Sequence, residues 1–193
     1  MLWKELDPIV SATGLVLIPD IRLADAPQLD VLCVPGGVGI NALLEDEAVL
    51  AFLRRQSAGA RYVTSVCTGA LVLAATGLLT GRRATTHWAS HDFLARLGAI
   101  PEPARVVADG KFISGGGVTA GIDMALTLAA ELLDREQAEA IQLHLEYAPA
   151  PPFTAGSPET APAEAVARVR AATRASREER EAIVSRIETR QAA

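Results

Sequence analysis

Cys67 is the residue of this chain whose type and position most clearly predict chemistry. It lies in residues 61–75, RYVTSVCTGALVLAA, where Val, Thr and Tyr before the cysteine predict a short buried strand and the Ala- and Leu-rich residues after it predict an apolar helix. At the start of a helix, unpaired N–H groups favour a thiolate, and small residues such as Gly69 permit a sharp turn. We therefore interpret Cys67 as a nucleophile, because a cysteine that only fills a gap in the core does not need this arrangement.

The second cysteine, Cys33, occurs in a different context. It lies within residues 30–34, DVLCV, which predict a continuous apolar strand. A cysteine in such a strand is typically inert, so we expect Cys33 to be buried in the core. The two contexts do not indicate a disulfide, and the His and Cys residues show no paired spacing of the kind that zinc sites require.

The composition of the chain indicates a soluble globular protein. Half of its 193 residues are hydrophobic, and its net charge is −5. A mildly acidic surface offers no electrostatic footprint for nucleic acid. The longest apolar stretches, residues 66–79 and 122–133, are too short to span a bilayer. The first residues, MLWKELD, do not resemble a signal peptide, so we expect a cytoplasmic protein with no membrane partner.

Strands and helices alternate along most of the chain. This alternation predicts an α/β fold, a doubly wound parallel-sheet three-layer sandwich of the flavodoxin-like type, with an added C-terminal helix. The carboxyl ends of parallel strands meet at one edge of such a sheet, so we expect the Gly36-Gly37 turn to lie beside Cys67. We predict strands at 14–18, 29–34 and 62–66, helices at 45–57, 68–79, 91–97, 119–133 and 138–147, and a hairpin around Asp109-Gly110.

The character of the sequence changes after Tyr147. Residues 148–158 are rich in proline and predict an extended arm. Residues 160–190 predict a charged helix with sparse apolar positions, which we interpret as a solvated helix in preference to a dimer contact. We divide the chain accordingly into a domain of residues 1–150 and an arm with a helix, residues 151–193.

Four segments of the chain form a recognisable set of motifs: VCTGA at residues 66–70, PGG at 35–37, GRRATTHW at 81–88 and GGGVTAGID at 115–123. Together they resemble the class I glutamine amidotransferase-like superfamily, which includes the intracellular proteases. Within that superfamily the chain resembles the isonitrile hydratases, from Trp3 through to the C-terminal helix. A very similar cysteine turn occurs in the ligand domain of AraC-type transcription regulators.

The resemblance implies a homodimer without a metal or organic cofactor that hydrates a small-molecule isonitrile to an N-substituted formamide. Cys67 would attack the terminal isonitrile carbon to give a thioimidate, which water hydrolyses. The backbone N–H groups of Thr68, Gly36 and Gly37 would stabilise negative charge, as in an oxyanion hole. For the Thr68 hydroxyl, a bond to the sulfur and a structural role at the helix start are equal alternatives. His87 matches a histidine near the cysteine in several members, and we favour a structural role for it over proton transfer.

The N-terminal segment departs from the family pattern. Family members carry a strand, a loop and a helix ahead of the segment that matches residues 3–7, and the turn after that strand supplies an acidic residue beside the cysteine. Asp7, Asp20 and Asp30 lie in the wrong contexts to replace it. We therefore expect an N-terminally truncated or mis-started copy whose catalysis is weakened, since general acid–base help is worth about 10²–10⁴-fold.

The sequence is also compatible with two other functions. One is an amidotransferase-like ligand-binding regulatory module without a DNA-binding domain, because residues 148–193 are too few for a helix-turn-helix domain. The other is a related cysteine hydrolase or deglycase that acts on a different electrophile. The arm at residues 149–158 and the surroundings of Trp88 favour a closed apolar pocket and hence a small apolar substrate.

Overall fold

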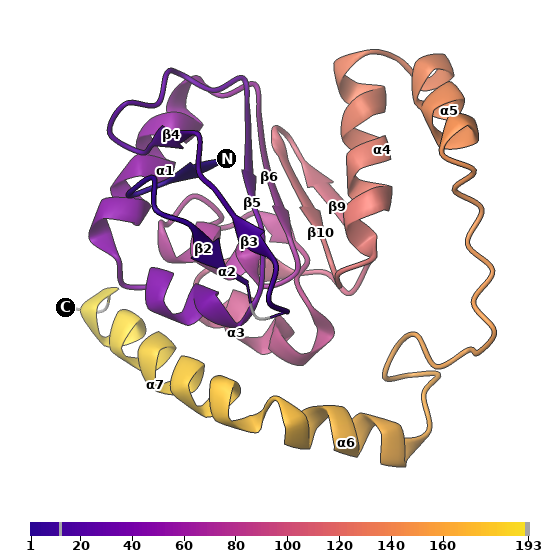
Figure 1. Ribbon diagram of the computed structural model, residues 1–193. Helices are drawn as coiled ribbons and strands as arrows, with labels where there is room; N and C mark the ends of the chain where they lie inside the picture. Colours follow the sequence, from indigo (N-terminus) through magenta and orange to yellow (C-terminus); the bar gives the residue numbers. More distant parts are fainter. Residues whose placement is uncertain (12, 192–193) are drawn as a thin grey trace.

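The computed structural model describes residues 1–11 and 13–191. Its centre is a four-stranded sheet of order β5-β6-β10-β9, in which β5, β6 and β10 run parallel and β9 pairs antiparallel with β10 (Figure 1). Gly110, with a φ of 59°, closes the predicted hairpin between β9 and β10, which is confirmed. The strands are β5 (Val31–Val34), β6 (Tyr62–Val66), β9 (Val106–Asp109) and β10 (Phe112–Gly115).

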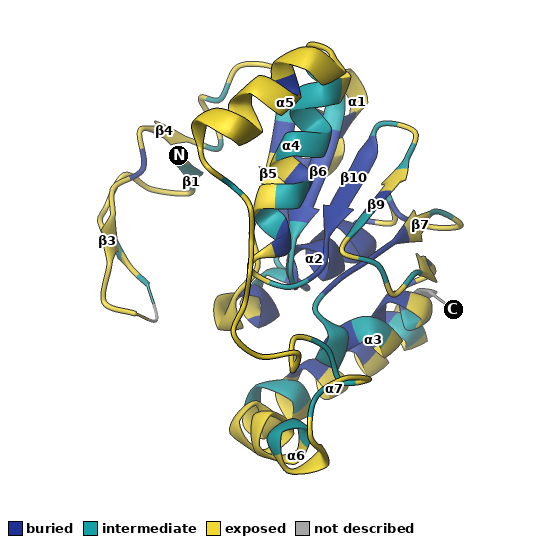
Figure 2. Cartoon of the chain, turned by 90° about the vertical axis from the view of Figure 1, so that its right-hand side faces the viewer, coloured by how far each residue is buried: buried dark blue, intermediate teal, exposed yellow. Residues whose placement is uncertain are grey.

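Helices cover both faces of this sheet, so the predicted α/β sandwich with parallel strands is confirmed (Figure 1). On one face, α1 (Glu47–Gly59) and α2 (Gly69–Ala75) pack on side chains such as Val63, which is fully buried. On the other face, α4 (Ala120–Leu132) packs against β10 and β6. Figure 2 shows β6, β10 and α2 as the buried centre of the molecule.

The ends of these helices follow from local chemistry. The Asp46 carboxylate accepts a hydrogen bond from the backbone N–H of Val49 and so caps α1. Gly98, with a φ of 84°, follows the short helix α3 (His91–Arg96) and its C-cap residue Leu97 in the left-handed conformation that commonly ends helices. The remaining helical elements are η1 (Val38–Leu43), η2 (Trp88–Ser90), α3 (His91–Arg96), α5 (Arg135–His144), α6 (Ala163–Ala172) and α7 (Arg174–Gln191).

The N-terminal residues form short strands that stay outside the main sheet. The strand predicted at 14–18 exists only as β3 (Val16–Leu17), which pairs antiparallel with β2 (Ile9–Val10). Because these two strands pair only with each other, apolar side chains such as Val10 and Ile18 are exposed, and Figure 2 shows β3 largely in the exposed colour. The other short pairs are β1 (Leu2–Trp3) with β4 (Ile21–Arg22) and β7 (Arg83–Ala84) with β8 (Ile100–Pro101).

The C-terminal segment corrects two expectations. It forms two helices instead of one, and the interpretation of a solvated helix is wrong for α7. Ile183, Val184 and Ile187 recur at helical spacing and are at most 7% exposed, because α7 packs on α3 and η1. Arg96 of α3 adds an ion pair with Glu188 of α7.

The expectation that Cys33 is buried is also wrong. The side chains of Leu32 and Val34 point to the α1–α2 face of β5 and are buried, whereas Cys33 points to the opposite face and is exposed. That face of the sheet is covered by α4, which packs on β6 and β10, while β5 is the strand at the sheet's edge. An apolar strand sequence therefore did not establish burial on both faces.

Candidate active site

Cys67 occupies a strained turn between β6 and α2, as the sequence predicted. Its φ of 56° lies in the left-handed region, which non-glycine residues rarely adopt. The backbone is held from both sides: the Cys67 N–H donates to the carbonyl oxygen of Gly115 (2.9 Å), and its own carbonyl oxygen accepts from the Thr86 hydroxyl (2.8 Å). The surrounding strands thus fix the cysteine at the carboxyl end of the sheet.

The Gly36-Gly37 turn lies directly against Cys67, which confirms the predicted juxtaposition. A Cβ atom on Gly36 would stand 2.7 Å from the backbone nitrogen of Thr68 and 2.8 Å from Cβ of Cys67. A Cβ atom on Gly69 would stand 2.1 Å from the carbonyl oxygen of Val34. The two chain segments pack this closely only because glycine carries no side chain.

Thr68 connects the two segments. Its hydroxyl oxygen accepts the Gly37 N–H (3.1 Å) and lies 3.3 Å from the Gly37 carbonyl oxygen, to which it can donate. The hydroxyl is therefore committed to Gly37, and in this arrangement the Gly37 N–H is already bonded. The Thr68 N–H, at the start of α2, has no acceptor among residues 1–11 and 13–191.

A cavity of about 260 Å³ opens beside the cysteine. It brings together Cys67, Thr68, Gly37 and His87, which the sequence predicted, and residues of the last two helices, which it did not. Within the part of the chain that the structure describes, no carboxylate lines this cavity. The further lining residues are Val38, Ala89, Ser90, Val118, Ala172, Thr173, Ser176, Arg177 and Arg180.

His87 lies between this cavity and a second one. It is half-buried, its Nδ1 atom accepts a hydrogen bond from the Ala89 N–H (3.4 Å), and its ring lies 5.6 Å from that of Trp88, centre to centre. Burial lowers the pKa of His87, and the positive charges of Arg180 and His91 lower it further. The imidazole is therefore neutral near pH 7, and because Nδ1 accepts from Ala89, the ring proton is on Nε2.

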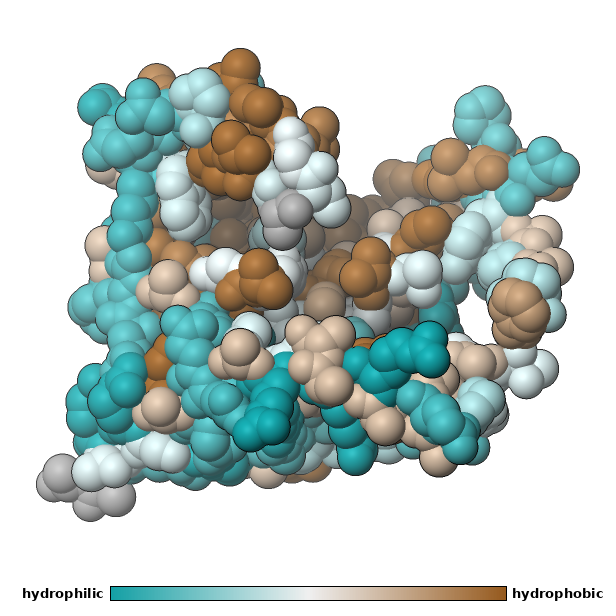
Figure 3. All heavy atoms as spheres, turned by 60° about the horizontal axis from the view of Figure 1, so that its bottom comes forward, coloured by the Kyte–Doolittle hydropathy of each residue, from teal (hydrophilic) through white to brown (hydrophobic). Residues whose placement is uncertain are grey.

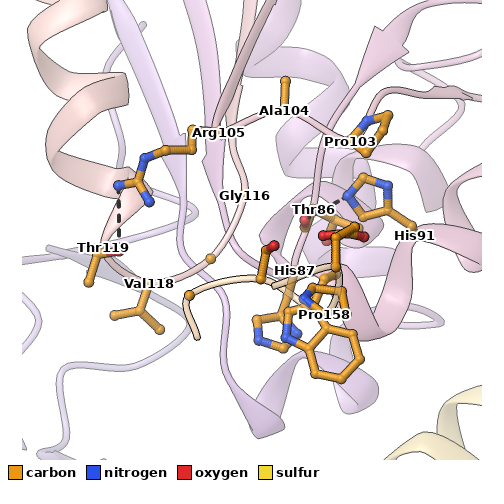
Figure 4. A pocket seen from close by; sticks show the side chains of 15 residues that line it. Thr86, His87, His91, Pro103, Ala104, Arg105, Gly116, Val118, Thr119 and Pro158 are labelled. Atoms are coloured by element: carbon orange, nitrogen blue, oxygen red, sulfur yellow. Dashed lines mark hydrogen bonds between the residues drawn. The ribbon is translucent and has the colours of Figure 1, made fainter. Parts of the chain in front are cut away.

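The second cavity has a volume of about 450 Å³ and includes part of the arm (Figure 4). His87 and Trp88 line it together with Arg105 and with residues 156–159 of the arm. The arm thus contributes to a cavity next to Trp88, but Arg105 and Glu159 make its wall partly charged, so the expectation of a closed apolar pocket is wrong for this cavity. Glu159 is the one carboxylate among the lining residues, and the Ser157 hydroxyl holds its pKa below the ordinary range, so the group is ionised near neutral pH.

The sequence interpretation missed Arg180 of α7. This residue is only 6% exposed, and its Nε and Nη1 atoms donate to Asn41 Oδ1 (2.9 Å) and Ser90 Oγ (3.0 Å). The signal was present in the sequence, because Arg180 lies on the same helical stripe as the apolar positions 183, 184 and 187. A charged residue on the buried stripe of a helix indicates a special environment.

Residues 1–11 and 13–191 contain no cluster of three or more His, Cys, Asp or Glu side chains that could hold a metal ion. Within the same ranges, none of the helices combines the length and apolar character needed to cross a membrane.

The fold and the turn at Cys67 together define the class of protein. Residues 3–131 match the DJ-1/PfpI family, and the chain belongs to this family. It is 62% identical to the isonitrile hydratase of Pseudomonas putida over an alignment of 174 residues. This alignment covers 89% of this chain and 76% of the hydratase. The crystal structure of a THiJ/PfpI family protein from Pseudomonas syringae superposes with a TM-score of 0.91, at 44% identity over 95% of this chain and 77% of the other. The resemblance to isonitrile hydratases is confirmed.

A transcription regulator shares part of this similarity. The HTH-type transcriptional regulator GbdR of Pseudomonas aeruginosa is 36% identical over 136 residues, which make up 68% of this chain but only 36% of the regulator. The similarity to part of a transcription regulator is therefore real, and it is weaker than the similarity to the hydratase.

Proposed function

We propose that this chain is a cysteine-dependent hydratase that converts a small isonitrile into an N-substituted formamide. The observation that carries the proposal is the position of Cys67, held at a φ of 56° and opening into a cavity of about 260 Å³, in a chain 62% identical to an isonitrile hydratase. The side chains of Val38, Val118 and Ala172 in the cavity wall support a substrate that is small and largely apolar.

The proposed reaction has two stages. The Cys67 thiolate forms a bond to the terminal carbon of R–N≡C, and the electron pair on that carbon takes up a proton, which gives the thioimidate R–N=CH–S–Cys. Water then adds to the same carbon, the nitrogen takes up a proton, and the carbon–sulfur bond breaks. One water molecule is consumed, R–NH–CHO leaves, and the thiol is regenerated without any change of oxidation state in the protein.

The neighbouring groups support this chemistry in different ways. The Thr68 N–H, which has no acceptor within the described residues, is available to stabilise negative charge on the intermediate. The Gly37 N–H acts indirectly, by fixing the Thr68 hydroxyl. Gly36 allows the close packing that places Thr68 beside Cys67. Because no carboxylate lines this cavity in the described chain, proton transfer in the proposal depends on neutral His87 and on water.

The direct test is formamide production from an aryl isonitrile by the purified chain, followed by chromatography. We expect turnover that is lost in Cys67→Ala while the circular dichroism spectrum and melting temperature stay close to those of the parent chain. Equal turnover in Cys67→Ala would overturn the proposal.

The regulatory alternative makes a different prediction in the same experiment. A ligand-binding module of the kind suggested by the similarity to GbdR would bind the isonitrile saturably and release no formamide. That result from folded protein would favour the binding module over the enzyme.

We also propose that the chain forms a homodimer. Apolar side chains are exposed on the β2–β3 hairpin, for example Val10 and Leu15, and on the α4–α5 pair, for example Ile122 and Leu143. In Figure 3, apolar side chains gather above a largely hydrophilic band, which α6 and α7 form along the lower edge of the molecule. Light scattering after gel filtration tests the proposal, since a mass near 20.3 kDa would identify a monomer instead.

A further inference from the structure

Arg180 is a buried cation whose hydrogen bonds all go to uncharged oxygens. Its guanidinium donates to the side-chain oxygens of Asn41 and Ser90 and approaches the Ser176 hydroxyl at 3.5 Å. Within the described chain, no carboxylate lies within ion-pair distance of it. Burying an unpaired charge is unfavourable, so an arginine that serves only to attach a helix is a poor choice at this position.

The carboxylates nearest to Arg180 are committed to other partners. Glu179 accepts from the Asn41 amide (2.6 Å), and Asp92 pairs with Arg177 at 2.6 Å. Arg177 also lines the cavity, but Asp92 balances its charge. Arg180 is thus the cation of the cavity wall that has no anion of its own.

The one group of the cavity wall that becomes an anion during the proposed reaction is the Cys67 thiol. We propose that the guanidinium of Arg180 is the counter-charge of the Cys67 thiolate, a positioning residue that keeps the nucleophile in its reactive form while Asn41 and Ser90 hold the guanidinium in place. The inference rests on the proposed role of Cys67 as the nucleophile and gives α7 a function in a site built mainly from β6 and α2.

His87 does not serve this purpose. Burial, Arg180 and His91 all lower its pKa, so near pH 7 the imidazole carries no charge to balance a thiolate. The site therefore differs from a cysteine–imidazolium pair, because the positive charge comes from an arginine, which stays charged between pH 5 and 10. The neutral histidine is left for proton transfer. The titratable and charged groups around the pair are Arg177 and Glu179 on α7 and Asp92 and His91 on α3.

The test measures the rate of Cys67 alkylation by iodoacetamide between pH 5 and 10. All variants carry Cys33→Ser, because Cys33 is exposed and would also react. In Arg180→Met we expect the midpoint of the pH profile to move upward by about one unit or more, so that alkylation at low pH slows about tenfold. In Arg180→Lys, which keeps a positive charge, the midpoint should stay close to that of the parent chain. Arg177→Met removes a cation already balanced by Asp92 and should move the midpoint less than Arg180→Met does. Equal profiles in the parent chain and in folded Arg180→Met would overturn the inference.

A second measurement does not require the arginine variants to fold. The difference in unfolding free energy between the parent chain and Cys67→Ser should grow in favour of the parent as pH rises from 6 to 9, because only the parent acquires the thiolate that balances Arg180. A constant difference across this range would contradict the pairing. Both readouts are independent of turnover, so a shifted profile without formamide production would support the counter-charge and reject the hydratase.

Discussion

The hydroxyl group of Thr86 donates a hydrogen bond to the carbonyl oxygen of Cys67, with an oxygen–oxygen distance of 2.8 Å. Thr86 is buried, and the bond fixes one side of a residue whose φ of 56° is unfavourable for an L-residue. The next residue along the chain is His87, the neutral imidazole between the two cavities. One segment therefore both holds the nucleophile in its strained conformation and supplies the imidazole that shares its cavity.

Replacing Thr86 by Val should remove this restraint. The Cys67 carbonyl then loses its hydroxyl donor, and leaving a buried acceptor unpaired costs about 1–3 kcal/mol in the free energy of unfolding. Urea denaturation measures the loss, and Thr86→Ser, which keeps the hydroxyl, is the matched control. An unfolding free energy unchanged in Thr86→Val would show that the bond does not support the turn.

Gly36→Ala should disrupt the site, because its new Cβ atom would stand 2.7 Å from the Thr68 nitrogen. We expect turnover to fall at least tenfold as Thr68 and Cys67 are displaced. Gly39→Ala is the control, since a Cβ atom there meets nothing within 4 Å. If both variants keep parental turnover, the close approach of Gly36 to Thr68 has no role in catalysis.

His87 should make stability depend on pH in a defined direction. Its pKa in the folded chain lies below the ordinary value of 6.5, so the unfolded chain binds the proton first as the pH falls. The contribution of His87 to the free energy of unfolding is therefore complete above pH 6.5 and declines below it, as pH falls toward the folded-state pKa. NMR titration of the His87 ring measures that pKa directly. A value at or above 6.5 would contradict the burial of its charge and the influence of Arg180.

Local sequence signals predicted the elements around the nucleophile. The strand–cysteine–glycine–helix run, the Gly36-Gly37 turn and the Asp109-Gly110 hairpin depend on short-range rules of turn and helix formation, and the structure confirms all three. Because parallel strands end at the same edge of a sheet, the sequence also predicted that Cys67 and the Gly36-Gly37 turn lie side by side.

Features that depend on which elements pack together were not predictable in this way. Cys33 is exposed because α4 covers β6 and β10 on that side of the sheet, which the sequence of β5 does not reveal. The apolar positions on α7 are few, yet they form one stripe, and that stripe is sufficient to dock the helix. Docking carries Arg180 into a site far away in the sequence, where its burial has a chemical consequence.

The docking of α7 makes its own prediction. Val184→Ala removes fully buried methyl groups and should lower the free energy of unfolding by about 1–3 kcal/mol. Val169→Ala on α6 is the matched control, because Val169 is 41% exposed and its truncation should change stability by less than about 0.5 kcal/mol. Equal effects of the two substitutions would mean that α7 is solvated after all.

If Cys67 performs the hydratase chemistry, its sulfur must carry the substrate during part of each turnover. Mass spectrometry of the chain quenched in acid during turnover of an aryl isonitrile should show one added isonitrile mass on the peptide that contains Cys67, with formamide appearing as the adduct decays. The adduct should be absent from Cys67→Ala. Formamide production without any adduct on Cys67, or with equal yield from Cys67→Ala, would contradict nucleophilic attack by Cys67.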